Sequence, residues 1–349
     1  MEQKSLDFLK QLINTPSPSG FEDAAAKVWR DYLGDAVYDT DVYCGSYAVA
    51  GFFHYPTIML SGHIDEVGFM VNYINSDGFV YVDMIGGVDP TVAVAKRVTI
   101  HNKNGPISGV FGKTAIHLLD KEDKAAKLHQ MFIDIGAKNK ADALKMISIG
   151  DPITFDVSFE EYPNNLIVGR GLDDRIGAWC VAEAITKLRE QRADLKCHVI
   201  GAATIQEENG IYGAKIAVEK VKPDIAIAID VTHATDSPGI SKEKCGDVRL
   251  GDGPSVNIGS TSHPKLNQML IDTAERNNIP LQMEASPRRS GTDADECFRA
   301  RGGIPTANIS VPNRYMHTPV EMISLDDLEN TVKLLVKFCL EYQNVDFRR

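Results

Sequence analysis

The sequence lacks any segment that predicts a membrane span or a signal peptide. No window approaches the roughly 18 consecutive apolar residues of a transmembrane helix, and the first stretch, MEQKSLDFLKQLIN, carries charges throughout. The six cysteines form no C-x-x-C pair, which argues against a paired-cysteine motif, and several of them stand in apolar runs. We therefore expect a cytoplasmic protein whose cysteines are small buried hydrophobes.

A surplus of positive charge is also absent. The 48 aspartates and glutamates outnumber the 37 lysines and arginines, so the net charge is −11. A nucleic-acid partner would require a basic surface, and an anionic membrane would repel an acidic chain. The stretch GVFGKT at 109–114 ends like a phosphate-binding loop, but Ile107 stands where that motif requires glycine. We therefore expect no binding to nucleic acid, membranes or nucleotides.

The sequence contains two kinds of region, which differ in their pattern of predicted secondary structure. The length of 349 residues predicts one large domain, or one domain that carries another. From about residue 70 to 158, short β-rich pieces such as GFVYVDMIGG and KRVTIHN alternate with glycine-containing turns, which predicts a small barrel or sandwich. The remainder predicts an α/β sheet with helices packed on its faces. Its expected helices are two within the first ~35 residues and then 174–190, 211–220, 263–277, 292–300 and 325–342, and its expected strands are 57–61, 197–205, 224–230, 280–284 and 305–310. The β-rich piece would then be inserted after strand 57–61, the first strand of that sheet.

Acids and histidines stand at five ends of these strands and loops. They are His63, the pair Asp173–Asp174, the pair Glu207–Glu208, Asp230 and His317. In open α/β sheets, ligands bind outside the carboxyl ends of the strands, so these five ends can converge. Each residue alone has an ordinary explanation: a hydrogen-bonded histidine, a solvated Glu-Glu turn, or an Asp-Asp pair at a helix start, where Asp174 would be a cap or a first-turn acid. Their conjunction at one sheet edge favours a single site.

The side chains of this group are suited to divalent metal ions. Imidazole and carboxylate are ligands of zinc, cobalt and manganese. One divalent ion would not offset four carboxylates, whereas two ions sharing an aspartate, as in two-metal hydrolases, would. One member of the Glu207–Glu208 pair would then bind metal, and its neighbour would move protons to and from an activated water.

The sequence resembles the tetrahedral, dodecameric metallo-aminopeptidases, a family that includes glutamyl aminopeptidases and proteins once labelled cellulase M. The resemblance runs nearly end to end, through SGHIDEVGFMV, GRGLDDRIG, TIQEENGIYGA, AIDVTHATDSPG, SGTDAD and ISVPNRYMHTPVEM. It implies a zinc-peptidase type of fold, in which a mixed central sheet with helices on both faces is formed by residues 1–69 and 159–349. It also implies that residues 70–158 are an inserted β-barrel that serves dimerisation and assembly into a dodecamer.

The resemblance also implies a role for each site residue. His63 and Asp230 would bind one metal ion, Glu208 and His317 the other, and Asp173 would bridge both. Glu207 would be the general base, and Asp65 would orient His63. The residues themselves support the role of Asp65, because positions i and i+2 of an extended segment share a face and a metal-bound histidine usually donates its free N–H to a carboxylate. The implied activity is removal of N-terminal residues from short peptides with two metal ions, zinc or cobalt foremost and manganese as a third option.

Two departures from the family pattern concern substrate preference. Asn209 follows the Glu pair where a small apolar residue is usual, and Arg288 and Arg289 precede SGTDAD where uncharged residues are usual. An arginine fork can hold a carboxylate, so acidic, leucine-type and broad preferences all stay open.

Three other functions also stay open. They are a metallo-deacylase of N-acylated amino acids, a non-catalytic assembly scaffold, and a glycosidase that uses Glu207 and Glu208. Adjacent glutamates suit the last poorly, because glycosidase carboxylates flank the sugar at about 5–9.5 Å.

Overall fold

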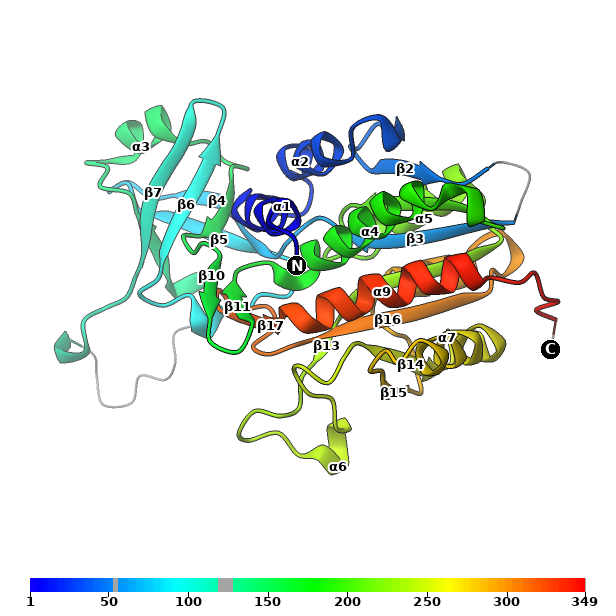
Figure 1. Ribbon diagram of the computed structural model, residues 1–349. Helices are drawn as coiled ribbons and strands as arrows, with labels where there is room; N and C mark the ends of the chain where they lie inside the picture. Colours follow the sequence, from blue (N-terminus) through cyan, green and yellow to red (C-terminus); the bar gives the residue numbers. More distant parts are fainter. Residues whose placement is uncertain (53–55, 119–127, 349) are drawn as a thin grey trace.

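A mixed eight-stranded sheet forms the centre of the molecule in the computed structural model, which describes residues 1–52, 56–118 and 128–348 (Figure 1). Its strands, in spatial order, are β1 (Val37–Thr40), β2 (Ser46–Ala50), β12 (His198–Thr204), β3 (Thr57–His63), β13 (Ile225–His233), β16 (Thr306–Asn313), β14 (Ser255–Gly259) and β15 (Gln282–Ser286). The four central strands β12, β3, β13 and β16 run parallel to one another. They are flanked by β2, which pairs antiparallel with β12, and by β14, which pairs antiparallel with β16. The carboxyl ends of the four parallel strands therefore meet at one edge.

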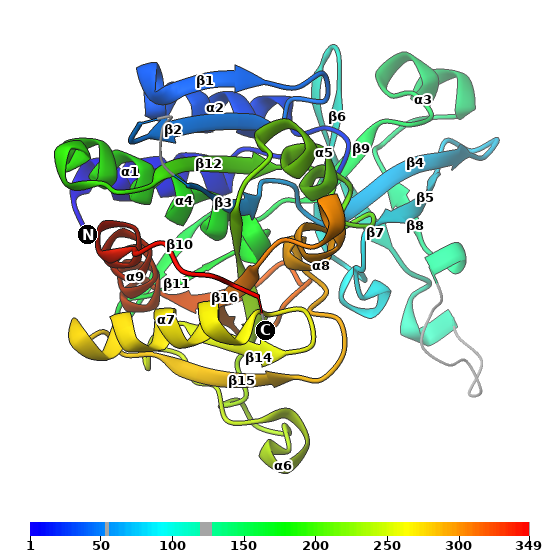
Figure 2. The ribbon, with the colours of Figure 1, turned by 90° about the vertical axis from the view of Figure 1, so that its right-hand side faces the viewer.

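Helices cover both faces of this sheet because its central strands are apolar on both sides. In β3, Ile58 and Leu60 pack into the larger core, and Met59 between them packs into a second core on the opposite face. Figure 2 shows α1, α4 and α9 on one side and α5 and α8 on the other. The helices are α1 (Gln3–Asn14), α2 (Asp23–Leu33), α3 (Lys140–Met146), α4 (Leu172–Glu190), α5 (Tyr212–Val221), α6 (Lys242–Cys245), α7 (Pro264–Arg276), α8 (Asp293–Arg299) and α9 (Leu325–Glu341). Among the described residues, no helix is long and apolar enough to cross a membrane.

A closed antiparallel barrel is inserted between β3 and α4, and it lies at one end of the molecule (Figure 1). Its strands, in order around the barrel, are β4 (Gly68–Ile74), β5 (Val80–Ile85), β8 (Phe132–Asp134), β7 (Gly105–Gly112), β6 (Arg97–Asn102) and β9 (Pro152–Phe155). Phe69 fills the interior with its ring centroid 5.0 Å from that of Phe111 and 5.5 Å from that of Phe155. The predicted fold class, a mixed sheet with helices on both faces and an inserted barrel, is confirmed.

Several strands of the structure are not predicted from the sequence. The sheet does not begin with 57–61, because β1 and β2 precede β3 at its edge, and β14 is a further strand that the pattern does not predict. A separate three-stranded antiparallel sheet consists of β10 (Glu160–Tyr162), β11 (Leu166–Gly169) and β17 (Glu321–Ser324). Of the six free cysteines, four are buried as expected, whereas Cys44 is half-buried and Cys245 is exposed.

Buried charge fixes the start of α4 to the end of β3. Glu66, which is 1% exposed, pairs with Arg170 and with the fully buried Arg175, whose Nη1 and Nη2 each lie 3.2 Å from a carboxylate oxygen. Arg175 also donates to the carbonyl of Gly171 (2.9 Å). Burial alone would raise the pKa of Glu66, but the two guanidinium groups outweigh burial and lower it. This ion cluster therefore holds the chain on both sides of Asp173 in place.

Glu66→Gln is expected to lower the free energy of unfolding by about 3–5 kcal/mol, because it leaves two buried guanidinium groups without their counter-charge. Urea denaturation followed by far-UV circular dichroism measures the change. The control is Asp35→Asn, which breaks an ion pair with Arg189 where the aspartate side chain is 90% exposed and is expected to cost under about 1 kcal/mol. Equal unfolding midpoints for the two variants would contradict the role given to the buried cluster.

Candidate metal centre

The site lies where two neighbouring strands of the sheet separate. β3 pairs with β13 only as far as Ser61 and Ala228, whereas β13 continues beside β16 to His233. Asp230 is therefore not the end of its strand, as the sequence predicts, but lies beside the gap that β3 leaves. Gly62 allows the first turns of α4 to approach this gap, because a Cβ there would run into the backbone of Gly177.

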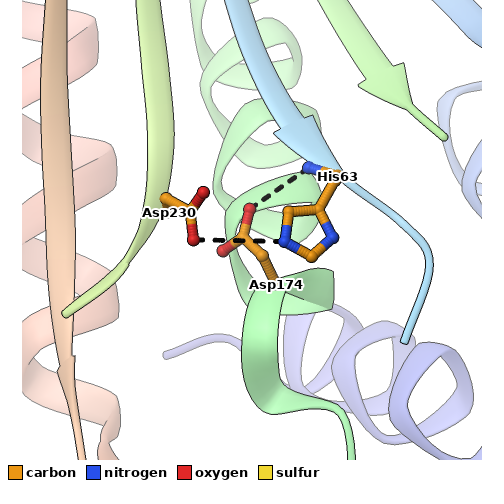
Figure 3. A group of neighbouring side chains, drawn as sticks. All are labelled: His63, Asp174 and Asp230. Carbon is orange, nitrogen blue, oxygen red and sulfur yellow. Dashed lines mark hydrogen bonds and ion pairs between the residues drawn. The ribbon is translucent and has the colours of Figure 1, made fainter. Parts of the chain in front are cut away.

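Two groups of potential ligands meet at this gap. In the first, one ligand atom from each of His63, Asp174 and Asp230 lies within 4.8 Å of the others. Figure 3 shows these three side chains converging from β3, α4 and β13. In the second group, the same criterion of 4.8 Å joins His63, Asp173 and Glu208. The two groups therefore bring together His63, Asp173, Glu208 and Asp230 of the expected site residues, and Asp174 joins them.

Asp173 lies between two histidines and presents one oxygen to each. Its Oδ1 is 3.2 Å from His63 Nε2, and its Oδ2 is 3.2 Å from His317 Nε2. Asp230 Oδ1 is 4.0 Å from His63 Nε2, and Glu208 Oε1 is 3.3 Å from His317 Nε2. The carboxylates thus divide between the two imidazoles, with Asp173 common to both.

Both histidines turn the same ring nitrogen toward these carboxylates. The other nitrogen of His63, Nδ1, lies 3.3 Å from Asp65 Oδ1. The Nδ1 of His317 lies 3.0 Å from the carbonyl oxygen of Gly87. An acceptor beside Nδ1 favours the tautomer that carries its proton there and leaves Nε2 free to bind a metal ion.

Carboxylates also hold the backbone of the segments that carry these side chains. Asp65 accepts the N–H groups of Glu207 (3.1 Å) and Glu208 (3.2 Å). Glu321, 1% exposed at the start of β17, accepts the N–H of Asp173 with one oxygen (2.9 Å) and that of His317 with the other (2.8 Å). Glu321 has no predicted role, although it lies within the segment ISVPNRYMHTPVEM that carries the family resemblance, four residues after His317.

Asp174 has a structural task that agrees with the capping role considered for it. Its Oδ1 accepts the N–H of Gly177 (3.0 Å), and its Oδ2 accepts the N–H of His63 (3.2 Å). The φ and ψ angles of Asp173 and Asp174 are not helical, so the regular helix begins after them. Asp174 therefore caps the regular part of α4 and fixes the end of β3, with each of its oxygens accepting one of these N–H groups.

The pKa values of the group reflect the negative charge that is buried in it. Burial raises the pKa of Glu207 to about 10, with a further contribution from the charges of Asp230 and Glu208. Burial and the charge of Asp173 raise the pKa of Asp230 well above its ordinary value. Burial alone would lower the pKa of His63, but Asp173 and Asp65 outweigh it and raise that pKa well above its ordinary value. Burial and neighbouring carboxylates thus raise the pKa of both acids, and the same carboxylates favour the protonated form of His63.

This donor set fits divalent cations. It consists of imidazole Nε2 atoms and carboxylate oxygens, which zinc, cobalt and manganese accept as ligands. Glu208 Oε1 is buried and accepts no hydrogen bond from any residue in the described part of the chain, although His317 Nε2 lies nearby. A cation at this position would supply the charge that the pKa shifts show to be lacking.

Two further observations concern residues outside the ligand group. Asp293, 2% exposed, accepts a hydrogen bond from Thr204 Oγ1 (2.6 Å) and lies close enough to raise the pKa of Asp174 and Glu207. Asp293 belongs to the segment SGTDAD that carries part of the family resemblance, but it has no predicted role. Arg288 and Arg289 are exposed in the loop between β15 and α8, so their part in substrate preference stays a prediction.

Comparison with known proteins identifies the family. The family model described as M42 glutamyl aminopeptidase matches residues 49–334. The chain belongs to this family. It is 33% identical over 350 residues to a lysyl aminopeptidase of Pyrococcus furiosus, with 98% of each chain covered. This M42 chain is accordingly a metallo-aminopeptidase, a peptide-bond hydrolase, and the predicted resemblance is confirmed.

Solved structures of two archaeal peptidases have the same fold along nearly the whole chain. A TET aminopeptidase from the marine sediment archaeon Thaumarchaeota archaeon SCGC AB-539-E09 superposes with a TM-score of 0.92 at 31% identity, covering 97% of this chain and 96% of that one. The TET1 peptidase of Pyrococcus horikoshii superposes with a TM-score of 0.86 at 31% identity, covering 97% and 100%. The M42 chain therefore shares both its sheet and its inserted barrel with these peptidases.

The two aspartates at the start of α4 are expected to differ in their effect on metal binding. Asp173→Ala removes the carboxylate that lies between the two histidines, so bound metal should be lost. Asp174→Asn should still bind metal to saturation with about 10–100-fold weaker affinity, because it disturbs the hydrogen bonds that support the site. Elemental analysis of each variant, dialysed against zinc and freed of excess metal, measures the stoichiometry. Full wild-type occupancy in Asp173→Ala would rule out a shared ligand.

Proposed function

We propose that the protein removes single amino acids from the N-termini of short peptides, with two divalent ions and Glu207 as the general base. The observation that carries this proposal is the position of Asp173, whose two oxygens face the Nε2 atoms of His63 and His317 at 3.2 Å each. A carboxylate shared in this way is what a pair of ions about 3.5–4 Å apart requires. His63 and Asp230 would hold one ion, and Glu208 and His317 the other.

The two ions, zinc or cobalt foremost and manganese as a third option, would polarise the scissile carbonyl and make water acidic enough to lose a proton near neutral pH. Glu207 belongs to neither ligand group, yet its Oε2 lies 3.9 Å from His63 Nε2. Its carboxylate would take the proton of the attacking water and return it to the leaving amine. Asp65 would keep Glu207 in reach of that water by accepting its backbone N–H.

The geometry also bears on how a substrate enters. The side chain of His317 is 30% exposed, whereas that of His63 is 2% exposed. A peptide would therefore approach from the side of His317 and stop against the buried end near His63. A blind end suits a substrate cut one residue from its terminus, with its free amine held by an acid or a metal ion.

The family spans different substrates, so the preferred residue is a separate question. The family model carries the description of a glutamyl aminopeptidase, and the Pyrococcus furiosus relative is a lysyl aminopeptidase. The metallo-deacylase alternative requires a blocked amine, so N-acetylated amino acids used as substrates distinguish it. A glycosidase would not use the two histidines, and a non-catalytic scaffold would not use Glu207.

Glu207→Gln is expected to keep the metal ions but lower kcat by about 10²–10⁴-fold, because an amide does not accept the water's proton. The assay compares Leu-, Glu- and Lys-p-nitroanilide with their N-acetylated counterparts, on protein of measured metal content. Glu160→Gln makes the same change on an exposed strand and should behave as wild type. Wild-type turnover in a metal-replete Glu207→Gln enzyme would place the base elsewhere, and preference for the acetylated substrates would favour the deacylase.

We further propose that the chain assembles into a twelve-chain tetrahedral shell, with residues 70–158 as the assembly domain. Two observations support this proposal. The Pyrococcus horikoshii TET1 peptidase can assemble into a tetrahedron or a large octahedral shell. In addition, the barrel of this chain exposes large apolar side chains on its outer surface, including Tyr73, Met84 and Val110, and exposed apolar groups of this kind are common at protein interfaces.

Light scattering after size exclusion, with metal retained in the buffer, is expected to give a particle of twelve chains of 38.3 kDa each. Interfaces between obligate subunits bury apolar area, which the exposed barrel residues can supply. A stable monomer at micromolar concentration would contradict assembly, and a larger shell would contradict the dodecamer. The same measurement on metal-stripped protein shows whether the particle depends on the ions.

A further inference from the structure

One turn of the inserted barrel touches the metal centre. This turn, residues 86–87, is called the barrel loop here and follows β5 directly. A Cβ built on Gly86 would lie 3.1 Å from Glu208 Cβ, and a Cβ built on Gly87 would lie 3.0 Å from His317 Nδ1. Two consecutive glycines thus contact Glu208 and His317, the two side chains assigned to the second metal ion alone. A methyl group on Gly87 would require the His317 ring to shift slightly, and one on Gly86 would press on Glu208 and also on Val67 Cγ1, 2.8 Å away.

The barrel loop also makes polar contacts with the same two segments. The carbonyl oxygen of Gly87 lies 3.0 Å from His317 Nδ1 and favours the tautomer that leaves Nε2 free. The N–H of Gly86 donates to Asn209 Oδ1 at 3.2 Å, directly after Glu208 in the chain. Asn209 is one of the two departures from the family pattern, and through this hydrogen bond it connects the segment of Glu208 to the barrel loop.

His63 and Asp230, which are assigned to the first metal ion alone, are supported by other parts of the chain. The Nδ1 of His63 lies beside Asp65, two residues along the same segment. Asp230 lies in the central strand β13, where Val231, the next residue, is paired with β16. The two histidines are therefore oriented by different parts of the protein, one by the catalytic sheet and the other by the inserted barrel.

We infer that the barrel loop, together with Asn209, positions Glu208 and His317 and so sets the affinity for the second metal ion separately from the first. This inference rests on the proposed two-ion function. It assigns the insert a part in the metal centre of its own chain, in addition to its proposed part in assembly. Changes in the barrel loop should consequently weaken one ion of the two.

The test is calorimetric titration of metal-stripped protein with zinc, with the bound metal measured by elemental analysis. Gly87→Ala has an ordinary backbone conformation to adopt, since Gly87 is not in the left-handed region, and its methyl group presses on the His317 ring. Asn209→Ala removes only the acceptor of the Gly86 N–H. The control is Asn72→Ala, which removes another exposed asparagine hydrogen bond, to Asp83 on the barrel (3.1 Å).

In the wild type and in Asn72→Ala, two zinc ions should bind. In Gly87→Ala the affinity for one of them should fall about 10–100-fold, as is typical when a group that orients a ligand is disturbed. Asn209→Ala should weaken the same ion by a smaller factor. In a His317→Ala background, which already lacks a ligand of the second ion, Gly87→Ala should not change the affinity of the ion that remains.

The outcomes separate this inference from the function on which it rests. If the wild type binds fewer than two ions, the two-ion function fails and the inference fails with it. If the wild type binds two and the Gly87→Ala and Asn209→Ala titrations match it, the inference alone is overturned. Equal weakening of both ions in Gly87→Ala, or further weakening in the His317→Ala background, would also overturn it, because the barrel loop would then act on the whole site.

Discussion

The structure of the catalytic part depends on keeping several carboxylates buried side by side. Asp173, Glu207, Glu208 and Asp230 gather within a few ångströms of two histidines, and Asp174 and Asp293 lie against them. Burial and mutual repulsion raise the pKa of most of these acids. A cluster of this kind costs free energy unless cations offset it. The rest of the site is arranged to hold the carboxylates together in spite of this cost.

The chain holds them with other carboxylates that accept backbone N–H groups. Asp174 accepts from His63, Asp65 accepts from Glu207 and Glu208, and Glu321 accepts from Asp173 and His317. The segments that carry His63, Asp173 and Glu208 are thus each fixed by an acid from another segment, and the backbone of His317 is fixed by Glu321, four residues further along the chain. Hydrogen bonds to charged acceptors are roughly twice as strong as neutral ones, so this cross-bracing positions the ligands more firmly than loops alone could.

The sequence predicts the features that depend on local pattern. Helices such as α4 and α9 and the central strands have long apolar runs, and the barrel has repeated short strands with glycine turns. Features that depend on distant partners are missed. β17 has four residues and exists because it pairs with β11, about 155 positions earlier in the chain. Glu321 can accept the N–H of Asp173 only because the fold brings together two residues that are 148 positions apart. No pattern within one segment contains that information.

The same distinction separates the two halves of the metal centre. His63 and Asp65 are a local pair, and their spacing alone suggests that one orients the other. The partner of His317 is a backbone carbonyl of the barrel, 230 positions away, which carries no side-chain signature at all. His317 is also the more exposed histidine, with 30% of its side chain accessible against 2% for His63. An exposed histidine can stay hydrated when it binds no metal ion, so burial does little to hold its ring in the orientation that binds metal. The half of the site nearer the solvent therefore has the greater need of support from another segment. The inserted barrel lies against that half, and two glycines let its backbone come close enough to provide the support.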